Sequence, residues 1–514
     1  MTWTSTNGVT LRDLVPVALR RQWVEQGHCP DHDLYSLFRE QATRWPSRVA
    51  VIDDQGDLGY AELHHEVLRL ATLLTRNGFG PHDIIATHMH NSRHAVVAEL
   101  AVAAIGAAAL PVPPGRGTAD ALSLLGRSRA SVALVDAESE VPMISGRLPH
   151  LRAVFVLPAV LPEPDPGWRA PQVDPEAPAR FLVSSGSETA PKIVAYSHNA
   201  FAGGRANYIR AVHRGEPVVR DLLLVSLASS YGSFGVAITL CCLGGTLVLT
   251  RRFHPEHALG LISAHRPTHV FAVPTMLRRM VDQPVHANLA SLRAVVSSSD
   301  MLLADTVHRV RRGFGVDLIN IYGSSDGVNC HTAHPEQGVG VPDHTVTEIR
   351  IIDGEICARG PMTPLCYLGA PELDSAYRLP GGWVRTGDRG RFDSGGRLHV
   401  LGRLRTVVVR GGYGISPAEV EREIAAHPMI GEVVCVPVPD EDLGERMCAC
   451  VTIRPGQQPP DLGQLTDFLR ARGLEPRKLP ELLLVLPEFP LAPTSKVCRR
   501  TLTRLATEST LVPR

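Results

Sequence analysis

The sequence predicts an α/β fold with a large N-terminal domain of helix-covered β-sheets and a small C-terminal α+β domain. Over about the first 400 residues, short apolar runs alternate with amphipathic segments of helical period, which is typical of parallel sheets covered by helices. Near residue 400 the pattern changes to closely spaced strands and capped helices. The length of 514 residues, with 44% hydrophobic and 20% charged residues, fits a globular chain of roughly three domain-sized units.

In the N-terminal part we expect a helix, a strand and a second helix that ends at a glycine, followed by further strands. The stretch from Ala95 to Pro113 contains Glu99, is rich in alanine and ends in prolines. We therefore expect a buried helix that enters a strand, and not a membrane span. The predicted elements, in chain order, are 33–45, 48–54, 60–78, 82–91, 95–113, 131–137 and 153–159.

In the C-terminal part, two strand-like runs joined by a turn precede a predicted helix that starts at Ser416. Ser416 is expected to be the N-cap and Pro417 the first helical residue, with Glu419 completing a capping box. Two strands and another helix are expected to follow at 432–439, 447–455 and 462–473.

We place the domain boundary at the turn formed by Leu404 and Arg405. This gives an N-terminal domain of residues 1–403 and a C-terminal domain of residues 404–514. The last four residues, "LVPR" at 511–514, match the first half of a thrombin cleavage site and are set aside as a tag remnant.

Composition excludes several classes of function. The formal net charge is zero, so neither nucleic acid nor an anionic membrane is expected as a partner. The N-terminus lacks the basic and apolar regions of a signal peptide. The ten cysteines include no C-x-x-C pair, which argues against a zinc site and favours reduced thiols in a cytoplasmic protein.

Lysine is scarce. Only three of the 52 basic residues are lysine, namely Lys192, Lys478 and Lys496. A lysine offers a compact point charge on a flexible stem, whereas arginine offers a rigid fork. A lysine retained in such a chain is therefore a candidate for holding a phosphate that moves during a reaction. For Lys478 we favour the interpretation that the lysine is present by chance and has no such role.

The segment "SSGSETAPKIVAYSHN" from Ser184 to Asn199 has the composition of a phosphate-binding loop. It joins two strand-like runs, and Pro191 stands where a Walker loop needs glycine, so a Walker ATPase is not expected. Hydroxyl groups, a glycine that lets backbone amides approach and a lysine charge still suit phosphate. These groups belong to Ser184, Ser185, Gly186, Ser187 and Lys192.

Together with later segments, this loop resembles the adenylate-forming superfamily, which includes acyl-CoA ligases, aryl-acid ligases, peptide-synthetase adenylation domains and luciferases. The resemblance runs in order over almost the whole chain and includes two of the three lysines. The matching segments are the loop ending in Pro191 and Lys192, "YGSSD" at Tyr322–Asp326, Thr386–Asp388, Gly402 with Arg403, and "PLAPTSK" ending at Lys496.

The resemblance implies a reaction in two halves. A carboxylate attacks the α-phosphate of ATP to give an acyl adenylate and pyrophosphate, and a nucleophile then displaces AMP. It also implies ATP and Mg²⁺ as cofactors, a small-molecule substrate, and a mobile C-terminal domain that rotates between the halves. CoA is the default acceptor because Gly411 and Gly412 match the passage for its pantetheine arm. A carrier protein stays open as the acceptor, and so does the oligomeric state.

The resemblance also implies roles for single residues. Lys496 is expected to bridge the attacking carboxylate and the α-phosphate, and Lys192 to hold phosphate. Asp388 and Arg403 are expected to contact the ribose or phosphate. Arg405 stands at the hinge position.

The "YGSSD" segment is expected to hold adenine and metal. Tyr322 would stack on adenine, and Ser325 lies in the same nucleotide-binding segment. Asp326 stands where the family has a glutamate that binds Mg²⁺, and its side chain is one methylene shorter.

Several positions depart from the family pattern. Glu188 puts a carboxylate in the phosphate loop; it points away, pairs with an arginine, or carries substrate or metal. Polar residues Ser298, Ser299 and Asp300 replace small ones, and they either polarise the substrate pocket or cap the following helix.

Ser229 and Tyr231 complete the predicted pocket. Ser229 stands where many acyl-CoA ligases have a histidine, and the asparagine that follows it in aryl-acid ligases is also absent. Long fatty acids and salicylate-type acids are therefore less expected substrates. The sequence therefore predicts ATP-dependent adenylation of a small or aromatic carboxylate and transfer, most simply to CoA. The alternatives are an ATP-dependent diazotase, which activates nitrite and diazotises an aromatic amine, and a nucleotide-binding protein without turnover.

Overall fold

The computed structural model describes residues 1–114, 118–137, 141–144, 146–157, 161–184, 191–284, 287–299, 302, 304–404, 408–410, 413–440, 442–492 and 496–511. These residues form two compact units. The first contains the described residues of 1–184, 191–350 and 357–386, and the second those of 351–356 and 387–511. The predicted boundary and hinge at Leu404 and Arg405 stay predictions, and Arg405 lies outside the described residues.

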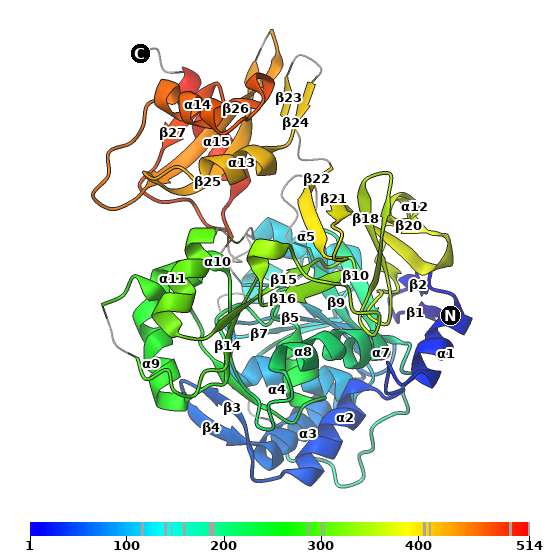
Figure 1. The fold of residues 1–514 in the computed structure, drawn as a ribbon. Helices are drawn as coiled ribbons and strands as arrows, with labels where there is room; N and C mark the ends of the chain where they lie inside the picture. The colour runs from blue at the N-terminus through cyan, green and yellow to red at the C-terminus, as the bar shows by residue number, and fades with distance from the viewer. Residues whose placement is uncertain are drawn as a thin grey trace. The chain divides into compact units, whose positions relative to one another are not determined.

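Two largely parallel sheets form the centre of the first unit (Figure 1). The seven-stranded sheet has the order β19-β10-β9-β6-β5-β7-β8 in the described part of the chain. Strands β5 to β9 pair in parallel, whereas β10 pairs antiparallel with both β9 and β19. Its strands are β5 (Ile84–His88), β6 (Ala108–Pro111), β7 (Val132–Val135), β8 (Ala153–Val156), β9 (Pro178–Val183), β10 (Ile193–Ser197) and β19 (Cys366–Tyr367).

The eight-stranded sheet has the order β16-β15-β14-β13-β11-β12-β3-β4 among the described residues. Its interior pairs are parallel, and antiparallel β16 and β4 form its two edges. Its strands are β3 (Val49–Asp53), β4 (Gly56–Gly59), β11 (Arg220–Leu223), β12 (Thr246–Leu249), β13 (His269–Ala272), β14 (Ala294–Ser298), β15 (Asp317–Gly323) and β16 (Asn329–Thr332).

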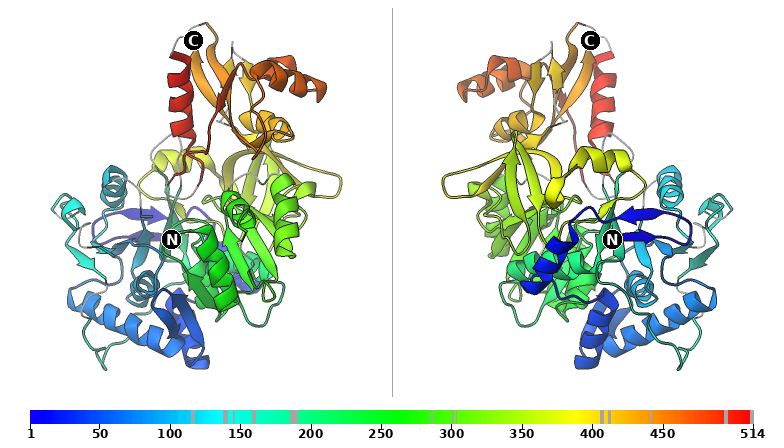
Figure 2. Two further views of the ribbon diagram at one scale, coloured as in Figure 1. Left: turned by 90° about the vertical axis from the view of Figure 1, so that its left-hand side faces the viewer. Right: turned by 90° about the vertical axis from the view of Figure 1, so that its right-hand side faces the viewer.

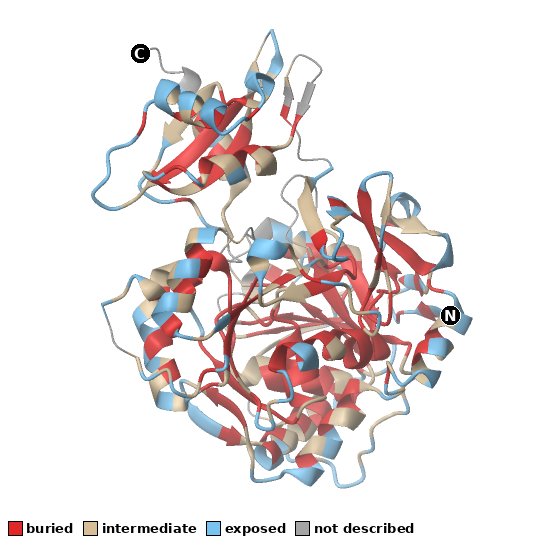
Figure 3. Cartoon of the chain, viewed as in Figure 1, coloured by how far each residue is buried: buried red, intermediate tan, exposed pale blue. Residues whose placement is uncertain are grey.

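Helices cover these sheets, and most of the central strands are buried (Figure 3), whereas β8 and the edge strand β4 are more exposed. The predicted α/β class with parallel, helix-covered sheets is confirmed. The helices of this unit are α1 (Val17–Glu25), α2 (Leu34–Arg44), α3 (Tyr60–Arg76), α4 (Arg93–Ala104), α5 (Thr118–Ser128), α6 (Val141–Ile144), α7 (His198–Ala200), α8 (Ala206–His213), α9 (Pro255–His265), α10 (Pro274–Val281), α11 (Ala304–Phe314) and α12 (Pro371–Tyr377). A short N-terminal hairpin is formed by β1 (Thr2–Thr4) and β2 (Thr10–Arg12).

The apolar stretch after Ala95 folds as predicted. It forms the buried helix α4, which leads into β6. Ser92 caps α4 by accepting a hydrogen bond from the backbone N–H of Ala95. The charge of Glu99 in this stretch is balanced by the buried guanidinium of Arg180. Among the described residues, no helix has both the length and the apolar character needed to cross a bilayer.

The second unit is built on a sheet of order β24-β23-β26-β25, with β27 beside β26. Helices α13 and α15 pack against β25 (Figure 2). The predicted C-terminal α+β region is confirmed in its strands and helices. The elements are β23 (Val408–Arg410), β24 (Tyr413–Ile415), α13 (Pro417–Ile424), β25 (Ile430–Asp440), β26 (Gly444–Ile453), α14 (Leu462–Ala471), β27 (Leu482–Val485) and α15 (Arg499–Leu511).

The predicted capping box at Ser416 does not form. Pro417 occupies the first turn of α13 as expected, but the Ser416 side chain makes no capping hydrogen bond. The carboxylate of Glu419 instead accepts a hydrogen bond from Lys478 Nζ at 2.7 Å. The Glu419 carboxylate therefore bonds to a residue far away in the sequence and does not complete a capping box with Ser416.

Five further strands complete the fold: β17 (Glu348–Ile352), β18 (Glu355–Arg359), β20 (Arg378–Leu379), β21 (Trp383–Phe392) and β22 (Leu398–Arg403). β20 pairs antiparallel with the start of β21, where Leu379 faces Trp383. β22 pairs antiparallel with the end of β21, where Arg403 faces Asp388. This second pairing brings two of the predicted nucleotide-binding residues together.

Candidate active site

The phosphate-type loop joins the antiparallel strands β9 and β10, as the sequence predicts. The backbone N–H of Ser184 donates to Lys192 O, and the backbone N–H of Lys192 donates to Ser184 Oγ, each at 2.9 Å. These two bonds close the base of the loop and fix the place from which the lysine side chain leaves. Ser185, Gly186, Ser187 and Glu188 lie outside the described residues.

The Lys192 side chain reaches a carboxylate between two aromatic rings. Its Nζ lies 3.6 Å from Asp326 Oδ1, 3.6 Å from the ring centroid of Tyr377 and 5.3 Å from that of Tyr367. A cation is attracted by both the carboxylate and the ring faces. The structure therefore brings the loop lysine and the predicted metal-binding acid together.

Asp326 is held by the turn between β15 and β16. Its backbone N–H bonds Ser324 Oγ at 3.1 Å, and its Oδ1 accepts a 2.5 Å hydrogen bond from the Tyr367 hydroxyl. Burial, followed by the Asp326 charge, raises the pKa of Tyr367 well above its usual value, so the phenol stays a donor. Among the described residues, the other oxygen, Oδ2, contacts the Ser324 hydroxyl at 3.4 Å. One carboxylate with an oxygen available is what Mg²⁺ commonly uses in proteins, so Asp326 fits the predicted metal role.

The neighbouring nucleotide-segment residues lie at the end of the eight-stranded sheet. Tyr322 is half-buried near the end of β15 and faces Cys330 of β16. Ser325 is buried, and its carbonyl accepts a 3.0 Å hydrogen bond from the Tyr196 hydroxyl. Burial raises the pKa of Tyr196 to about 12, so this hydroxyl also stays protonated. Tyr196 and Tyr367 thus fix both the backbone and the carboxylate of the turn.

The predicted pocket serines lie at the end of the adjacent strand, β14. Ser298 Oγ donates to Ile321 O at 2.9 Å, which ties its hydroxyl to β15. Ser299 has φ = +83°, a left-handed conformation that favours glycine. This strained position coincides with a place where the related family has a small residue. Asp300 lies outside the described residues.

Ser229 and Tyr231 are both engaged in main-chain hydrogen bonds. Ser229 Oγ donates to Ser226 O at 2.7 Å and accepts from the Gly232 N–H at 2.9 Å. Tyr231 donates its hydroxyl to Val296 O of β14 at 3.0 Å. Ser229 therefore closes a turn, and Tyr231 braces the strand that ends at Ser298.

The second unit holds the other predicted nucleotide residues. Arg403 Nε lies 2.8 Å from Asp388 Oδ1; the Asp388 side chain is 7% exposed and that of Arg403 is 56% exposed. The backbone N–H of Gly387 donates to the buried Glu355 at 2.9 Å. These bonds orient Asp388 and leave the outer part of the Arg403 guanidinium accessible to a ligand.

Lys496 lies shortly before α15. Leu491 pairs with Val497, and the backbone N–H of Ala492 donates to Lys496 O at 2.7 Å. Lys496 is half-buried. Gly411 and Gly412 lie outside the described residues.

Tyr367 and Tyr377, whose rings lie beside Lys192 Nζ, were not predicted from the sequence. Tyr367 is placed beside the loop because β19 pairs with β10, where Tyr367 faces Val194. The signal was weak: β19 has only two residues, and its partner strand lies far away in the sequence.

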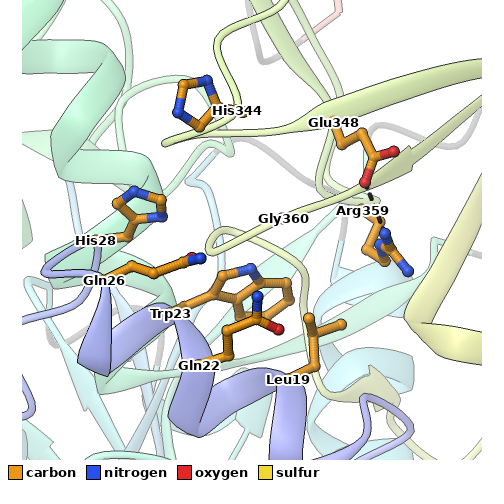
Figure 4. Close-up of a pocket in the computed structure, with 9 residues that line it drawn as sticks. All are labelled: Leu19, Gln22, Trp23, Gln26, His28, His344, Glu348, Arg359 and Gly360. Carbon is orange, nitrogen blue, oxygen red and sulfur yellow. Dashed lines mark hydrogen bonds and ion pairs between the residues drawn. The ribbon is translucent and has the colours of Figure 1, made fainter.

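A separate surface pocket of about 460 Å³ lies in the first unit (Figure 4). Trp23 and Gln22 of α1 lie on one side of it, and the Glu348–Arg359 ion pair, 2.7 Å long, lies on another. None of the predicted site residues lines it. We therefore assign this pocket no part in the predicted chemistry.

Comparison with known proteins identifies the family of the chain. The family model described as "AMP-binding enzyme" matches residues 38–368, and the model of the AMP-binding enzyme C-terminal domain matches residues 419–496. Triostin synthetase I of Streptomyces triostinicus is 30% identical over 96% of this chain and 98% of its own.

Two further proteins are similar over nearly their full length. A salicyl-AMP ligase / salicyl-S-ArCP synthetase of Mycobacterium tuberculosis is 28% identical over 93% of this chain and 91% of its own. The structure of the amide bond synthetase McbA from Marinactinospora thermotolerans matches with a TM-score of 0.80 and 27% identity, over 92% of this chain and 100% of its own.

Proposed function

The chain belongs to the AMP-binding enzyme family of the adenylate-forming superfamily, and we propose that it adenylates a small or aromatic carboxylate with ATP and passes the acyl group to a nucleophile, most simply CoA. The observation that carries the proposal is the pairing of Lys192 with Asp326 at 3.6 Å. A phosphate-binding cation and a carboxylate suited to Mg²⁺ thereby lie side by side. The similarity to a salicyl-AMP ligase supports an aromatic acid as the substrate class.

In this proposal the residues of the first unit bind the phosphates. Bound Mg²⁺ supplies positive charge that offsets the negative charge of the phosphate oxygens. Asp326 would hold the ion, and its tyrosine partner Tyr367 would keep the carboxylate oriented. Lys192 would bind the phosphate chain through its ammonium group, which lies 3.6 Å from Asp326 Oδ1. The closed base of the loop keeps that lysine in reach.

The residues of the second unit would act on the ribose and the reacting atoms. Asp388 would accept hydrogen bonds from the ribose hydroxyls, with Arg403 beside it as a second contact. Lys496 would place a point charge between the carboxylate and the α-phosphate, where negative charge gathers in the transition state.

A screen of pyrophosphate release tests this proposal. The enzyme is incubated with ATP, Mg²⁺ and a panel of small and aromatic acids, with and without CoA. We expect release that depends on an acid, and a thioester only when CoA is present. Acid-dependent release that leads to a thioester only on a phosphopantetheinyl carrier protein would instead assign the carrier as the acceptor.

A second candidate function is ATP-dependent diazotisation, in which nitrite is activated and an aromatic amine is the nucleophile. The observation that favours it is the similarity to McbA, whose name describes amide bond formation and hence a nitrogen nucleophile. The test uses ATP, Mg²⁺, nitrite and aminohydroxybenzoic acids near neutral pH. Diazo absorbance that needs both ATP and enzyme would establish it. AMP formation that needs a carboxylate and is indifferent to nitrite would exclude it.

A further inference from the structure

Arg378 carries a buried charge that its surroundings do not satisfy. It begins β20 directly after α12, and its side chain is 7% exposed. Within the described residues, none of its three guanidinium nitrogens has a hydrogen-bond partner. A buried polar group that makes no hydrogen bond destabilises a protein, and a buried charged group does so most.

The nearest carboxylate does not resolve this. Asp374 Oδ1 lies 3.8 Å from Arg378 Nε, which is longer than a hydrogen bond. The same oxygen already accepts a 3.0 Å bond from the backbone N–H of Tyr367. Burial raises the pKa of Asp374, which further weakens it as a counter-ion. The guanidinium therefore retains N–H donors that have no acceptor within the described residues, which indicates that an acceptor is missing.

The guanidinium lies beside the phosphate-site cluster. Its Cζ is 5.4 Å from the ring centroid of Tyr367, and Lys192 Nζ is 5.3 Å from the same centroid. The hydroxyl of Tyr367 bonds Asp326. A ring face attracts a cation but accepts none of the in-plane N–H bonds of an arginine fork. Lys192 and Arg378 thus both lie beside Tyr367, and the guanidinium of Arg378 has no hydrogen-bond acceptor in the described part of the chain.

We propose that Arg378 binds an oxyanion next to Lys192. The planar fork can donate to two oxygens at once, whereas Lys192 adds a movable point charge. Two sources supply this chemistry: the terminal phosphates of ATP or pyrophosphate, and a small free oxyanion such as nitrite. The proposal rests on the proposed function where it places the ATP phosphates beside Arg378. The binding of an oxyanion by Arg378 does not depend on that function.

Arg378→Met separates a ligand-binding role from a structural one. Methionine is long and apolar, and replacing a buried charge with an apolar side chain is often neutral or stabilising. We expect the variant without ligand to melt at the same temperature as the parent or higher. A structural role predicts a lower melting temperature. Arg359→Met is the matched control, because Arg359 already has an acceptor in Glu348 at 2.7 Å.

The binding test uses the full chain with pyrophosphate and with nitrite as separate probes, measured by calorimetry and by ligand-induced thermal shift. We expect Arg378→Met to weaken at least one probe tenfold or more, and Arg359→Met to leave both unchanged. If only pyrophosphate binding weakens, the ligand of Arg378 is the phosphate chain. If only nitrite binding weakens, the ligand is a small free oxyanion. Arg378→Lys keeps the charge without the fork and should show a smaller loss.

The proposal is overturned if the parent binds neither probe, or if both probes bind Arg378→Met and Arg378→Lys as tightly as the parent. AMP binding distinguishes this failure from failure of the proposed function. If no acid supports pyrophosphate release but Arg378→Met still loses oxyanion binding with AMP affinity unchanged, the function is wrong and the oxyanion site stands.

Discussion

Lys192 Nζ and Asp326 Oδ1 lie 3.6 Å apart, although 134 positions separate the two residues in the sequence. The lysine leaves a loop of the seven-stranded sheet, and the aspartate sits in a turn of the eight-stranded sheet. The site is therefore formed where the ends of two different sheets meet. In the proposed function Asp326 would hold Mg²⁺ and Lys192 would bind phosphate, so we expect metal binding to weaken the contact between the two side chains.

Replacing Asp326 tests this coupling. Asp326→Asn removes the charge that pairs with Lys192 but keeps a group that can accept the Tyr367 hydrogen bond. We expect a higher Mg²⁺ concentration for half-maximal pyrophosphate release and a lower maximal rate, because a neutral amide oxygen is a weaker ligand for a hard cation. Asp326→Glu should retain most of the activity. An unchanged Mg²⁺ requirement in Asp326→Asn would contradict the metal role.

Lys496→Ala should lower adenylate formation by at least about 100-fold, the usual scale for losing a group that stabilises charge in the transition state. ATP affinity and the melting temperature should stay near the parental values. Lys478→Ala is the matched control, since Lys478 pairs with Glu419 at 2.7 Å and Glu475 at 3.9 Å, away from the predicted site residues, and partly exposed pairs contribute about 0–1 kcal/mol. Pyrophosphate release at the parental rate in Lys496→Ala would refute the assignment.

Asp388→Ala should weaken AMP binding about tenfold or more, because a hydrogen bond to a charged group is worth about 1.5–3 kcal/mol. Loss of the Arg403 pair should matter little to stability, since the Arg403 side chain is 56% exposed. Calorimetry with AMP measures the effect. Asp467→Ala, which removes an exposed pair with Arg470 in α14, is the control. Equal AMP affinity in both variants would remove Asp388 from the nucleotide site.

A buried histidine predicts a pH dependence of stability. His213 Nδ1 faces Ile209 O at 2.7 Å, and its Nε2 faces Asp221 Oδ1 at 2.8 Å. Burial opposes the charge of His213, but Asp221 outweighs it and raises the pKa of His213. The neighbouring His269 stays neutral, because burial lowers its pKa to about 4.

A raised folded-state pKa stabilises the protein fully below the unfolded value of about 6.5, and the effect is lost as the pH rises through the folded value. The melting temperatures of the parent and of His213→Gln should therefore differ most near pH 6. The difference should shrink as the pH increases to 9. A difference that is constant across this range would show that His213 acts by packing alone.

The sequence predicted the strands and helices because these depend on local patterns. Apolar runs indicated β3, β5 and the buried helix α4. The motifs identified Lys192 and Asp326 separately, and the 3.6 Å contact between their side chains emerges only in the folded chain.

The missed features depend on long-range contacts. Tyr367 reaches the site through a two-residue strand that pairs with β10, and no periodicity marks so short a strand. Glu419 fits a capping box in sequence, but Lys478, 59 residues away, takes its carboxylate. Arg378 belongs to no motif. Its guanidinium is buried and makes no hydrogen bond within the described residues, which only the tertiary structure reveals.

The most direct test of the central claim is exchange of labelled pyrophosphate into ATP, because it reports the first half-reaction whatever the acceptor. The account predicts exchange that requires Mg²⁺ and a small or aromatic carboxylic acid, and that disappears in Lys496→Ala. If the enzyme binds ATP by calorimetry but shows no exchange with any acid of a broad panel, the proposed adenylation of a carboxylate is wrong.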